Sequence, residues 1–267
     1  MDAGRLPWCF REGRFPVTDS TCVIGTAGWS IPAADRPNFP ETGTALQRYA
    51  AVMHGVEVNS SFHRPHRQST WARWAASVPD DFRFAAKIPK SISHDLRLHD
   101  AAAPLDRFLD EVSGLSGKLA LLLLQLPPSL VFDHATVTRF LADVGERTDT
   151  SIVCEPRHAS WFEPDVDSLL AAQKVARVAA DPARVPAAAR SGGWRGLTYY
   201  RLHGSPDMYR TAYGRDRLRD YARLIAEDRA AGRPAWCMFD NTAASAALGD
   251  ALQLTELVGA SSDGRAG

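Results

Sequence analysis

Residues 154–161, which read CEPRHASW, place several reactive side chain types close together. A short run rich in β-branched residues, 150–153, precedes them and predicts a buried strand. This strand ends in a carboxylate, Glu155, and Arg157 and His158 follow within three residues. Such groups are costly to bury without partners, but at the rim of a sheet they can bind anions or transfer protons. The stretch therefore indicates a functional site at the end of a strand.

The same order, an apolar strand followed by polar side chains, recurs along the chain. We expect strands at residues 22–26, 55–59, 82–87, 118–124, 151–155, 175–180, 197–202 and 234–239. The polar or aromatic residues at or just beyond their ends are Trp29, Glu57, Asn59, Lys87, Gln125, Glu155, Arg157, His158, Asp181, Arg201, His203, Asp240 and Asn241. This repetition is the main indication of function in the sequence.

The segments that must position these residues alternate between strand and helix. Helical spacing occurs at residues 44–54, 70–74, 105–112, 135–144, 166–173, 218–230 and 243–258, while residues 183–196, rich in Ala, Pro and Gly, predict a short excursion. About eight such units without a dividing linker predict an α/β fold, a single (β/α)8 TIM-type barrel over residues 22–258. Residues 1–21 are expected to form an irregular N-terminal arm, and residues 259–267 a disordered polar tail.

In such a barrel the C-terminal ends of all strands meet at one mouth, where catalytic groups lie. Glu57, Glu155 and His203 are the predicted catalytic residues, because carboxylates and an imidazole can exchange protons near neutral pH. Lys87, Arg157 and Arg201 are expected to hold a phosphate or carboxylate group of the substrate. The other predicted substrate-binding residues are Trp29, Asn59, Gln125, His158, Asp240 and Asn241.

Three alternatives use the same side chains differently. Buried ion pairs inside the barrel, for instance Glu57 with Arg201, would be structural. Asp181, Asp240 and Asn241 could serve as helix N-caps. A divalent metal held by Glu57, Glu155, His203 and Asp240 is a further alternative, although no HxH or HExxH spacing supports it. We expect no cofactor: the sequence contains neither the GxGxxG of dinucleotide-binding folds after the first strand nor a P-loop.

Composition limits the partners. The 267 residues include 31 basic and 31 acidic side chains, so the formal net charge is zero. A protein that coats nucleic acid usually has a basic excess, so the charge does not favour nucleic acid as a partner. Residues 1–21 lack the apolar stretch of a signal peptide, and the longest apolar run, 119–124, is too short to span a bilayer. We expect a cytoplasmic protein whose partner is a small anionic molecule and not a membrane.

Several motifs, in order along the chain, resemble signatures of the DUF72 (YecE-like) family. They are residues 24–29 (IGTAGW), 57–62 (EVNSSF), 82–87 (FRFAAK), 125–128 (QLPP), 155–161 (EPRHASW), 200–204 (YRLHG) and 239–241 (FDN). The resemblance covers nearly the whole chain and implies a TIM-type barrel, but it implies no particular reaction. This sequence departs from the family pattern at Pro156 and Asp240, where the family usually has an aromatic residue and Asn.

Together these observations predict an enzyme that acts at the mouth of the barrel on an anionic, phosphorylated or sugar-like substrate by general acid–base chemistry. Its class would be hydrolase-like or isomerase-like. One alternative is a module that binds a nucleotide or a nucleic-acid end without turnover. Another is a hydrolase that depends on a divalent metal ion.

Overall fold

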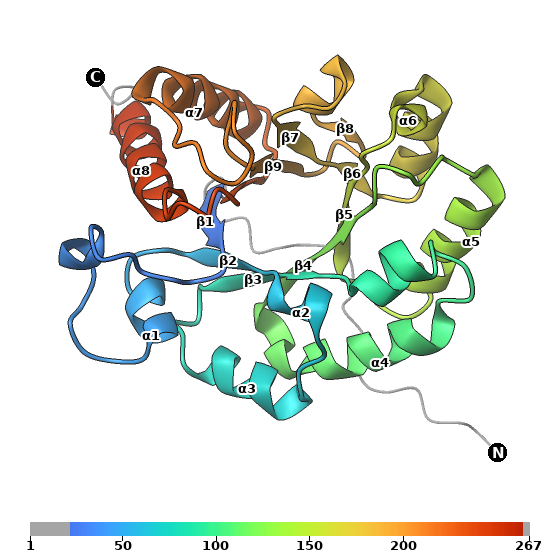
Figure 1. The fold of residues 1–267 in the computed structure, drawn as a ribbon, viewed down its shortest axis with the longest axis horizontal. Helices are drawn as coiled ribbons and strands as arrows, with labels where there is room; N and C mark the ends of the chain where they lie inside the picture. The colour runs from blue at the N-terminus through green and yellow to red at the C-terminus, as the bar shows by residue number, and fades with distance from the viewer. Residues whose placement is uncertain (1–21, 264–267) are drawn as a thin grey trace.

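The apolar runs of the sequence form ten strands that join into one sheet, curved into a nearly closed barrel (Figure 1). The computed structural model describes residues 22–263, with side chains up to residue 259, so the predicted arm at residues 1–21 lies outside the described residues. The strands are β1 (Cys22–Ala27), β2 (Gly55–Val58), β3 (Arg83–Lys87), β4 (Leu119–Gln125), β5 (Ser151–Glu155), β6 (Ala176–Arg177), β7 (Ala179–Asp181), β8 (Gly192–Gly193), β9 (Thr198–Leu202) and β10 (Ala235–Phe239). Neighbouring strands are parallel except β6 and β8.

One segment closes the barrel. The strand predicted at residues 175–180 is divided at Val178 into β6, which pairs with β5, and β7, which pairs with β9. The Val178 amide still donates to the carbonyl oxygen of Cys154 on β5, at 2.9 Å. The two ends of the sheet are therefore joined through residues 176–181, and all the predicted strands contribute to one barrel.

Helices surround the strands as an outer ring (Figure 1). They are α1 (Ala45–Ala50), α2 (Ser60–His63), α3 (Gln68–Ala76), α4 (Ala102–Val112), α5 (His134–Gly145), α6 (Pro164–Ala172), α7 (Arg215–Ala230) and α8 (Ala247–Asp263), with the short helices η1 (Arg36–Asn38), η2 (Ser91–Asp95), η3 (Ser113–Lys118), η4 (Ala159–Phe162) and η5 (Pro186–Ala189). Between β7 and β9 only η5 and β8 occur, as the composition of residues 183–196 predicts. Within residues 22–263 no helix is both long and apolar enough to cross a membrane.

Some boundaries differ from the sequence prediction. The connection after β3 contains a π-helix, η2, which is not among the predicted helices. Helix α4 ends at Val112, as predicted, but begins at Ala102, and the following Gly114 packs against α3, where an added Cβ would lie 2.3 Å from the Gln68 carbonyl oxygen. Helix α8 begins at Ala247 and reaches Asp263, so it starts and ends later than the predicted range 243–258.

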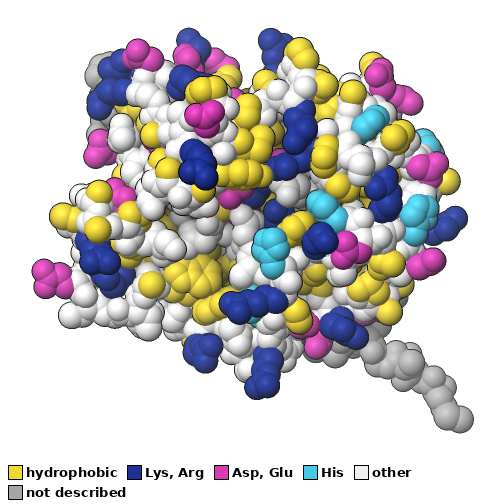
Figure 2. Space-filling model, viewed as in Figure 1, with side chains coloured by type: hydrophobic (Ala, Val, Ile, Leu, Met, Phe, Trp, Pro, Cys, Tyr) yellow, Lys and Arg dark blue, Asp and Glu magenta, His cyan; other side chains and the backbone are white. Residues whose placement is uncertain are grey.

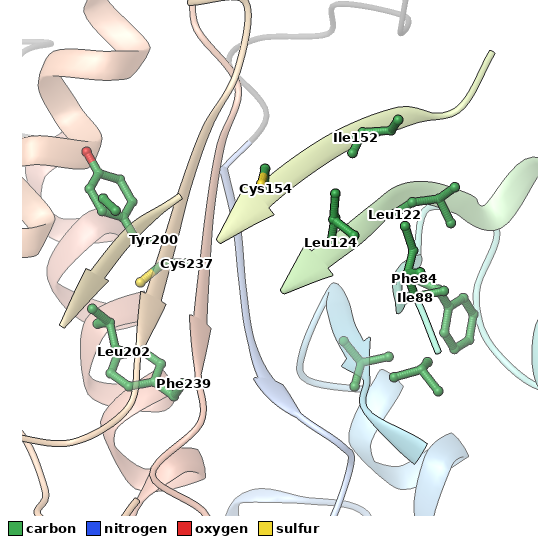
Figure 3. Close-up of a cluster of buried hydrophobic side chains, with 14 of the residues drawn as sticks. Phe84, Ile88, Leu122, Leu124, Ile152, Cys154, Tyr200, Leu202, Cys237 and Phe239 are labelled. Atoms are coloured by element: carbon green, nitrogen blue, oxygen red, sulfur yellow. The ribbon is translucent and has the colours of Figure 1, made fainter. Parts of the chain in front are cut away.

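Alternation along each strand separates two apolar regions. Figure 3 shows side chains from the outer face of the barrel, including Leu122 and Leu124 of β4 and Tyr200 and Leu202 of β9. Inward-facing residues at the alternate positions, such as Leu121 and Leu123 of β4 and Tyr199 of β9, form a second apolar cluster. This period of two is the geometry of a pleated strand with both faces buried. It also decides which polar residues reach the interior further along each strand.

Candidate functional site

Arg201 lies at the centre of a cluster of charged side chains inside the barrel, near the C-terminal ends of the strands. Tyr199, Arg201 and His203 occupy alternate positions of β9 and the residue after it, so all three face the interior. The Arg201 side chain is completely buried. A buried guanidinium requires carboxylates and hydrogen-bond acceptors around it, and three neighbouring strand ends provide them.

Glu57 of β2 is the first carboxylate partner of Arg201. The guanidinium donates from Nε to Glu57 Oε2 at 2.9 Å and from Nη2 to Glu57 Oε1 at 2.5 Å, a bidentate arrangement. The Tyr199 hydroxyl donates to Glu57 Oε2 at 2.7 Å. Both oxygens of Glu57 are thus occupied and its side chain is not exposed. Glu57 and Arg201 form the buried ion pair that the sequence offered as an alternative.

Glu155, at the end of β5, accepts hydrogen bonds from four side chains. Arg201 Nη1 and Gln125 Nε2 donate to Oε2, each at 2.9 Å. Arg157 Nη2 donates to Oε1 at 3.1 Å, and His203 Nε2 lies 3.0 Å from the same oxygen. Burial by itself raises the pKa of this carboxyl, but Arg201, His203 and Arg157 together hold the pKa well below its usual range.

His203 bridges two carboxylates. Its Nε2 contacts Glu155 Oε1 at 3.0 Å, and its Nδ1 contacts Asp240 Oδ2 at 3.1 Å. A neutral imidazole has one N–H, whereas both of these partners are acceptors, so the contacts require the doubly protonated ring. Burial lowers the pKa of His203, but Glu155 and the hydrogen bonds to Asp240 and Glu155 outweigh it and the pKa is raised. The raised pKa and the two carboxylate contacts both favour the imidazolium form of His203.

Asp240, directly after β10, is the third carboxylate of the cluster. Its Oδ2 lies 2.9 Å from Arg201 Nη2, and its Oδ1 accepts a 3.4 Å hydrogen bond from Asn59 Nδ2. Burial raises the pKa of Asp240, but Arg201, His203 and Lys87 outweigh burial and lower it. The Asp240 side chain is 11% exposed, so it lies at the outer edge of the cluster.

Lys87, at the end of β3, is the cation of the cluster that lacks a carboxylate contact. Its residue exposure is 7%, and among the described residues no carboxylate oxygen lies within 4.0 Å of Nζ. Instead, Nζ lies 4.1 Å from the centre of the Phe62 ring, a cation–π contact. Burial and the charge of Arg201 lower the pKa of Lys87 to about 8, although Glu57, Glu155 and Asp240 act in the opposite direction.

Phe62 and His94 complete the surroundings of Lys87 and were not among the predicted site residues. Phe62 belongs to α2, which follows β2, and His94 belongs to the π-helix η2, which follows β3. Their rings meet edge to face with centres 5.0 Å apart. Burial and then the charges of Lys87, Lys90 and Arg157 lower the pKa of His94, which is therefore neutral near pH 7. The sequence feature that could have identified Phe62 and His94 as site residues is their position in the segments that follow β2 and β3.

Three predicted site residues lie outside this cluster. Trp29 packs against Trp74, with ring centres 5.0 Å apart. His158 accepts the Ser160 amide hydrogen bond at the start of η4, so it holds the turn after β5. Asn241 is buried and donates to Asp250 of α8 at 2.7 Å. Asn241 follows Asp240 directly, and successive strand residues point to opposite faces.

The geometry gives the divalent-metal alternative no support. Within residues 22–259, no three His, Cys, Asp or Glu side chains are arranged as a metal site. Glu57, Glu155 and Asp240 all direct oxygen atoms at Arg201, so a guanidinium occupies the place between them. A small cavity of about 10 Å³ lies beside Glu155 and His203, with Arg157 and Met208 in its wall. That is about the least space that admits one water molecule.

The positive side of the cluster reaches the surface. The Arg157 side chain is 14% exposed, more than that of its partner Glu155, at 2%, and slightly more than that of Asp240, at 11%. Figure 2 shows Lys or Arg and His side chains around the centre of the face turned to the viewer. Three carboxylates in the cluster face four cationic groups, Arg201, Arg157, Lys87 and the His203 imidazolium. The site therefore has an excess of one positive charge when both Lys87 and His203 are protonated.

Comparisons with known proteins agree with the motifs. The family model described as "Protein of unknown function DUF72" matches residues 23–266. UPF0759 protein YecE of Escherichia coli K12 is 33% identical over 104 residues, which are 39% of this chain and 37% of YecE. The match therefore spans little more than a third of YecE. UPF0759 protein YunF of Bacillus subtilis is 23% identical over 265 residues, which are 88% of this chain and 94% of YunF.

Two solved structures have the same fold. A DUF72 family protein from Enterococcus faecalis V583 superposes with a TM-score of 0.76 at 19% identity, covering 90% of this chain and 96% of the other. A DUF72 family protein from Thermotoga maritima MSB8 gives a TM-score of 0.74 at 22% identity, covering 90% of this chain and 99% of the other. At these identities the likeness concerns the fold alone, and it supports the barrel.

Proposed function

The chain belongs to the DUF72 family, whose function is not known, and on that premise we propose that it binds a small anionic molecule at the mouth of its barrel and acts on it by acid–base chemistry. The observation that carries this proposal is the unpaired Lys87. It is the fourth cationic group beside three carboxylates, nearly buried and without a carboxylate contact among the described residues. A buried charge without a partner is costly, and a bound anion would remove that cost.

Lys87 and Arg157 are the groups that would hold the anion. Arg157 is partly exposed, and its guanidinium, which donates from Nε and Nη2 to Glu155, has further N–H donors for a carboxylate or phosphate. Arg201 is not available for this role, because Glu57, Glu155 and Asp240 occupy its donors. In this proposal Arg201 and Glu57 position the cluster and do not touch the ligand, which changes the roles predicted from the sequence.

The proton for acid–base chemistry would come from His203. This imidazolium lies between Glu155 and Asp240 and borders the water-sized cavity. Glu155 is a weak base because its pKa is held low, so it stabilises the imidazolium and directs the ring. A phosphorylated or sugar-like substrate fits this arrangement, and so does a carboxylate. The cytoplasmic location expected from the sequence stays a prediction.

Thermal unfolding with anions tests the proposal. We expect inorganic phosphate to raise the melting temperature above that in chloride of equal ionic strength, because a ligand that binds the folded state stabilises it by about 1.4 kcal/mol at tenfold its Kd. Arg157→Gln should reduce this increment. Arg219→Gln is the matched control, since Arg219 pairs with Asp216 on the exposed surface of α7. Equal increments in wild type and Arg157→Gln would contradict the proposal.

A further inference from the structure

Lysine is rare in this chain, and this makes its presence in the site informative. Only four of the 31 basic residues are lysines, at positions 87, 90, 118 and 174, and the other 27 are arginines. An arginine stays charged at every accessible pH, whereas a lysine can lose its proton and become a nucleophile. In a chain that uses arginine nearly everywhere, the buried cation beside the cluster is a lysine.

The surroundings of Lys87 differ from those of the other lysines. Lys90 pairs with Asp95 at 3.0 Å on the surface. Lys118 donates to the carbonyl oxygens of Ala75 and Val78, at 2.9 and 2.7 Å. Lys174 is exposed. Lys87 is the buried one, and its amine rests on the Phe62 ring without a carboxylate partner among the described residues.

We propose that Lys87 is a nucleophile that forms an imine with a small anionic carbonyl compound, a 2-oxo acid or a phosphorylated aldehyde. This inference rests on the proposed function, because it places the anionic group of that compound on Arg157. The burial of the amine without a carboxylate contact and the fixed positive charge of Arg201 both favour the neutral amine. Desolvation and a neighbouring cation are the two ways in which proteins activate a lysine for this chemistry.

Burial, more than the surrounding charges, moves the Lys87 amine toward the free base. Arg201 lowers the pKa of Lys87, and Glu57, Glu155 and Asp240 raise it, but burial is the largest effect and the pKa falls to about 8. His94, whose ring also contacts the Phe62 ring, is neutral near pH 7 and adds no positive charge. About one amine in ten is then unprotonated at pH 7, and about half at pH 8, whereas an ordinary lysine is almost fully protonated.

The reaction needs no oxidant or further reactant. The lone pair of Nζ attacks the carbonyl carbon, a C–N bond forms, and the π electrons of the C=O bond move to oxygen. The oxygen takes up the two protons that nitrogen loses and leaves as water, which gives the C=N bond of the imine.

Reductive trapping tests this inference. The intact protein is incubated at pH 8 with glyoxylate or pyruvate, reduced with sodium borohydride, digested and mapped by mass spectrometry. We expect the reduced adduct on Lys87 in at least about tenfold excess over Lys90, Lys118 and Lys174, because the lowered pKa of Lys87 raises its free-amine fraction at pH 8. Labelling of Lys87 should rise with pH with a midpoint near 8.

Two variants serve as controls. Lys87→Arg keeps the charge and should lose the adduct, while Lys90→Arg should keep it; if Lys87→Arg does not fold, Lys87→Met replaces it. Equal labelling of all four lysines would overturn the inference. If phosphate stabilises the protein but no adduct forms on Lys87, the imine is excluded and anion binding stands. If phosphate has no effect and no adduct forms, both the inference and the proposed function fail.

Discussion

The buried Arg201 side chain forms ion pairs with three carboxylates, so each of these negative charges is compensated by Arg201. Replacing Arg201 by Met would leave Glu57, Glu155 and Asp240 close together without their central cation. Removing one member of a buried ion pair costs about 3–5 kcal/mol, so we expect a loss of at least this size in the free energy of unfolding, measured with urea. Arg219→Met, at an exposed ion pair, should change it by less than about 1 kcal/mol. A small effect of Arg201→Met would mean that the carboxylates are not charged in the folded protein.

Lys87 should have the opposite effect on stability. Because the buried amine lacks a carboxylate partner, Lys87→Met removes an uncompensated charge, and we expect the free energy of unfolding at pH 7 to rise by about 1–3 kcal/mol. The folded pKa, about 8, lies below the ordinary lysine value of 10.5, so the cost of the charge is full below pH 8 and disappears as pH approaches 10.5. Urea unfolding of both proteins at pH 7 measures the stabilisation by Lys87→Met, and the same measurement at pH 9.5 shows how much of the charge cost has disappeared.

The control for Lys87→Met is Lys90→Met, which removes an exposed ion pair and should change stability little. The same Lys87→Met protein should lose most of the phosphate-induced increment in melting temperature. If Lys87→Met destabilised the protein at pH 7, the contacts of the lysine side chain would stabilise the fold by more free energy than the burial of its charge costs.

The residue types at the strand ends could be predicted from the sequence, but their pairing could not. Glu57 and Arg201 are 144 positions apart, so their contact depends on the register of distant strands and on the closure of the barrel. A period of two along β9 could have added Tyr199, which faces the same side as Arg201. The same rule separates Asn241 from Asp240, two residues that the sequence analysis treated alike.

At the scale of elements, α1 fixes the first two strands through one hydroxyl group. Tyr49 accepts a hydrogen bond from the Thr26 amide of β1 at 3.0 Å and donates to the Gly55 carbonyl oxygen of β2 at 3.1 Å. Gly25 and Gly55 are paired in the sheet, and their lack of side chains leaves room for this hydroxyl group. The contact sets the position of β2, which carries Glu57.

Gly25→Ala should disturb this junction. An added Cβ would lie 2.2 Å from the Gly55 carbonyl oxygen and 3.2 Å from the Tyr49 hydroxyl, so the strands would have to move apart. We expect a loss of several kcal/mol, on the order of the larger single-residue effects, in chemical denaturation. Gly145→Ala is the matched control, because no atom lies within 4 Å of its added Cβ and alanine favours the helix. Similar stabilities of the two variants would contradict the proposed packing.

The positions of most elements followed from apolar runs and their periodicity, whereas local irregularities did not. The division of the sixth strand at Val178 depends on its two different neighbours, β5 and β9, which no local pattern encodes. The π-helix η2 likewise depends on tertiary packing, since Ile92 and Ser93 are buried within a polar stretch. These departures lie next to the site, where His94 and the cavity beside Glu155 are found.

At the scale of the whole molecule, the barrel interior is divided into an apolar part and a charged part. Leu121, Leu123 and Val153 belong to the apolar cluster, and the following inward positions, Gln125 and Glu155, belong to the charged one. Zero net charge of the chain is therefore compatible with a locally positive mouth. The composition could exclude a strongly basic surface, but it could not reveal how the charges are distributed.

The charged part should make the stability of the whole fold depend on pH. The pKa of His203 is raised in the folded protein by Glu155 and Asp240, against burial and the charge of Arg201. Its contribution is complete below the unfolded value of about 6.5 and is lost as pH rises through the folded pKa. The pKa values of Glu155 and Asp240 are lowered, so their contribution is present above the unfolded values and is lost in acid.

We therefore expect the free energy of unfolding to fall as pH rises above about 6.5, with a slope of at most about 1.4 kcal/mol per pH unit from the one proton of His203. His203→Gln should remove this slope. Both proteins contain Lys87, so its opposite contribution above pH 8 cancels in the difference between their free energies of unfolding. Urea unfolding at pH 6.5, 7.5 and 8.5 measures it, with the exposed His54→Gln as control. If His203→Gln and wild type had parallel profiles, the ring would be neutral in the folded protein. The acid–base role proposed for it would then have to pass to another group.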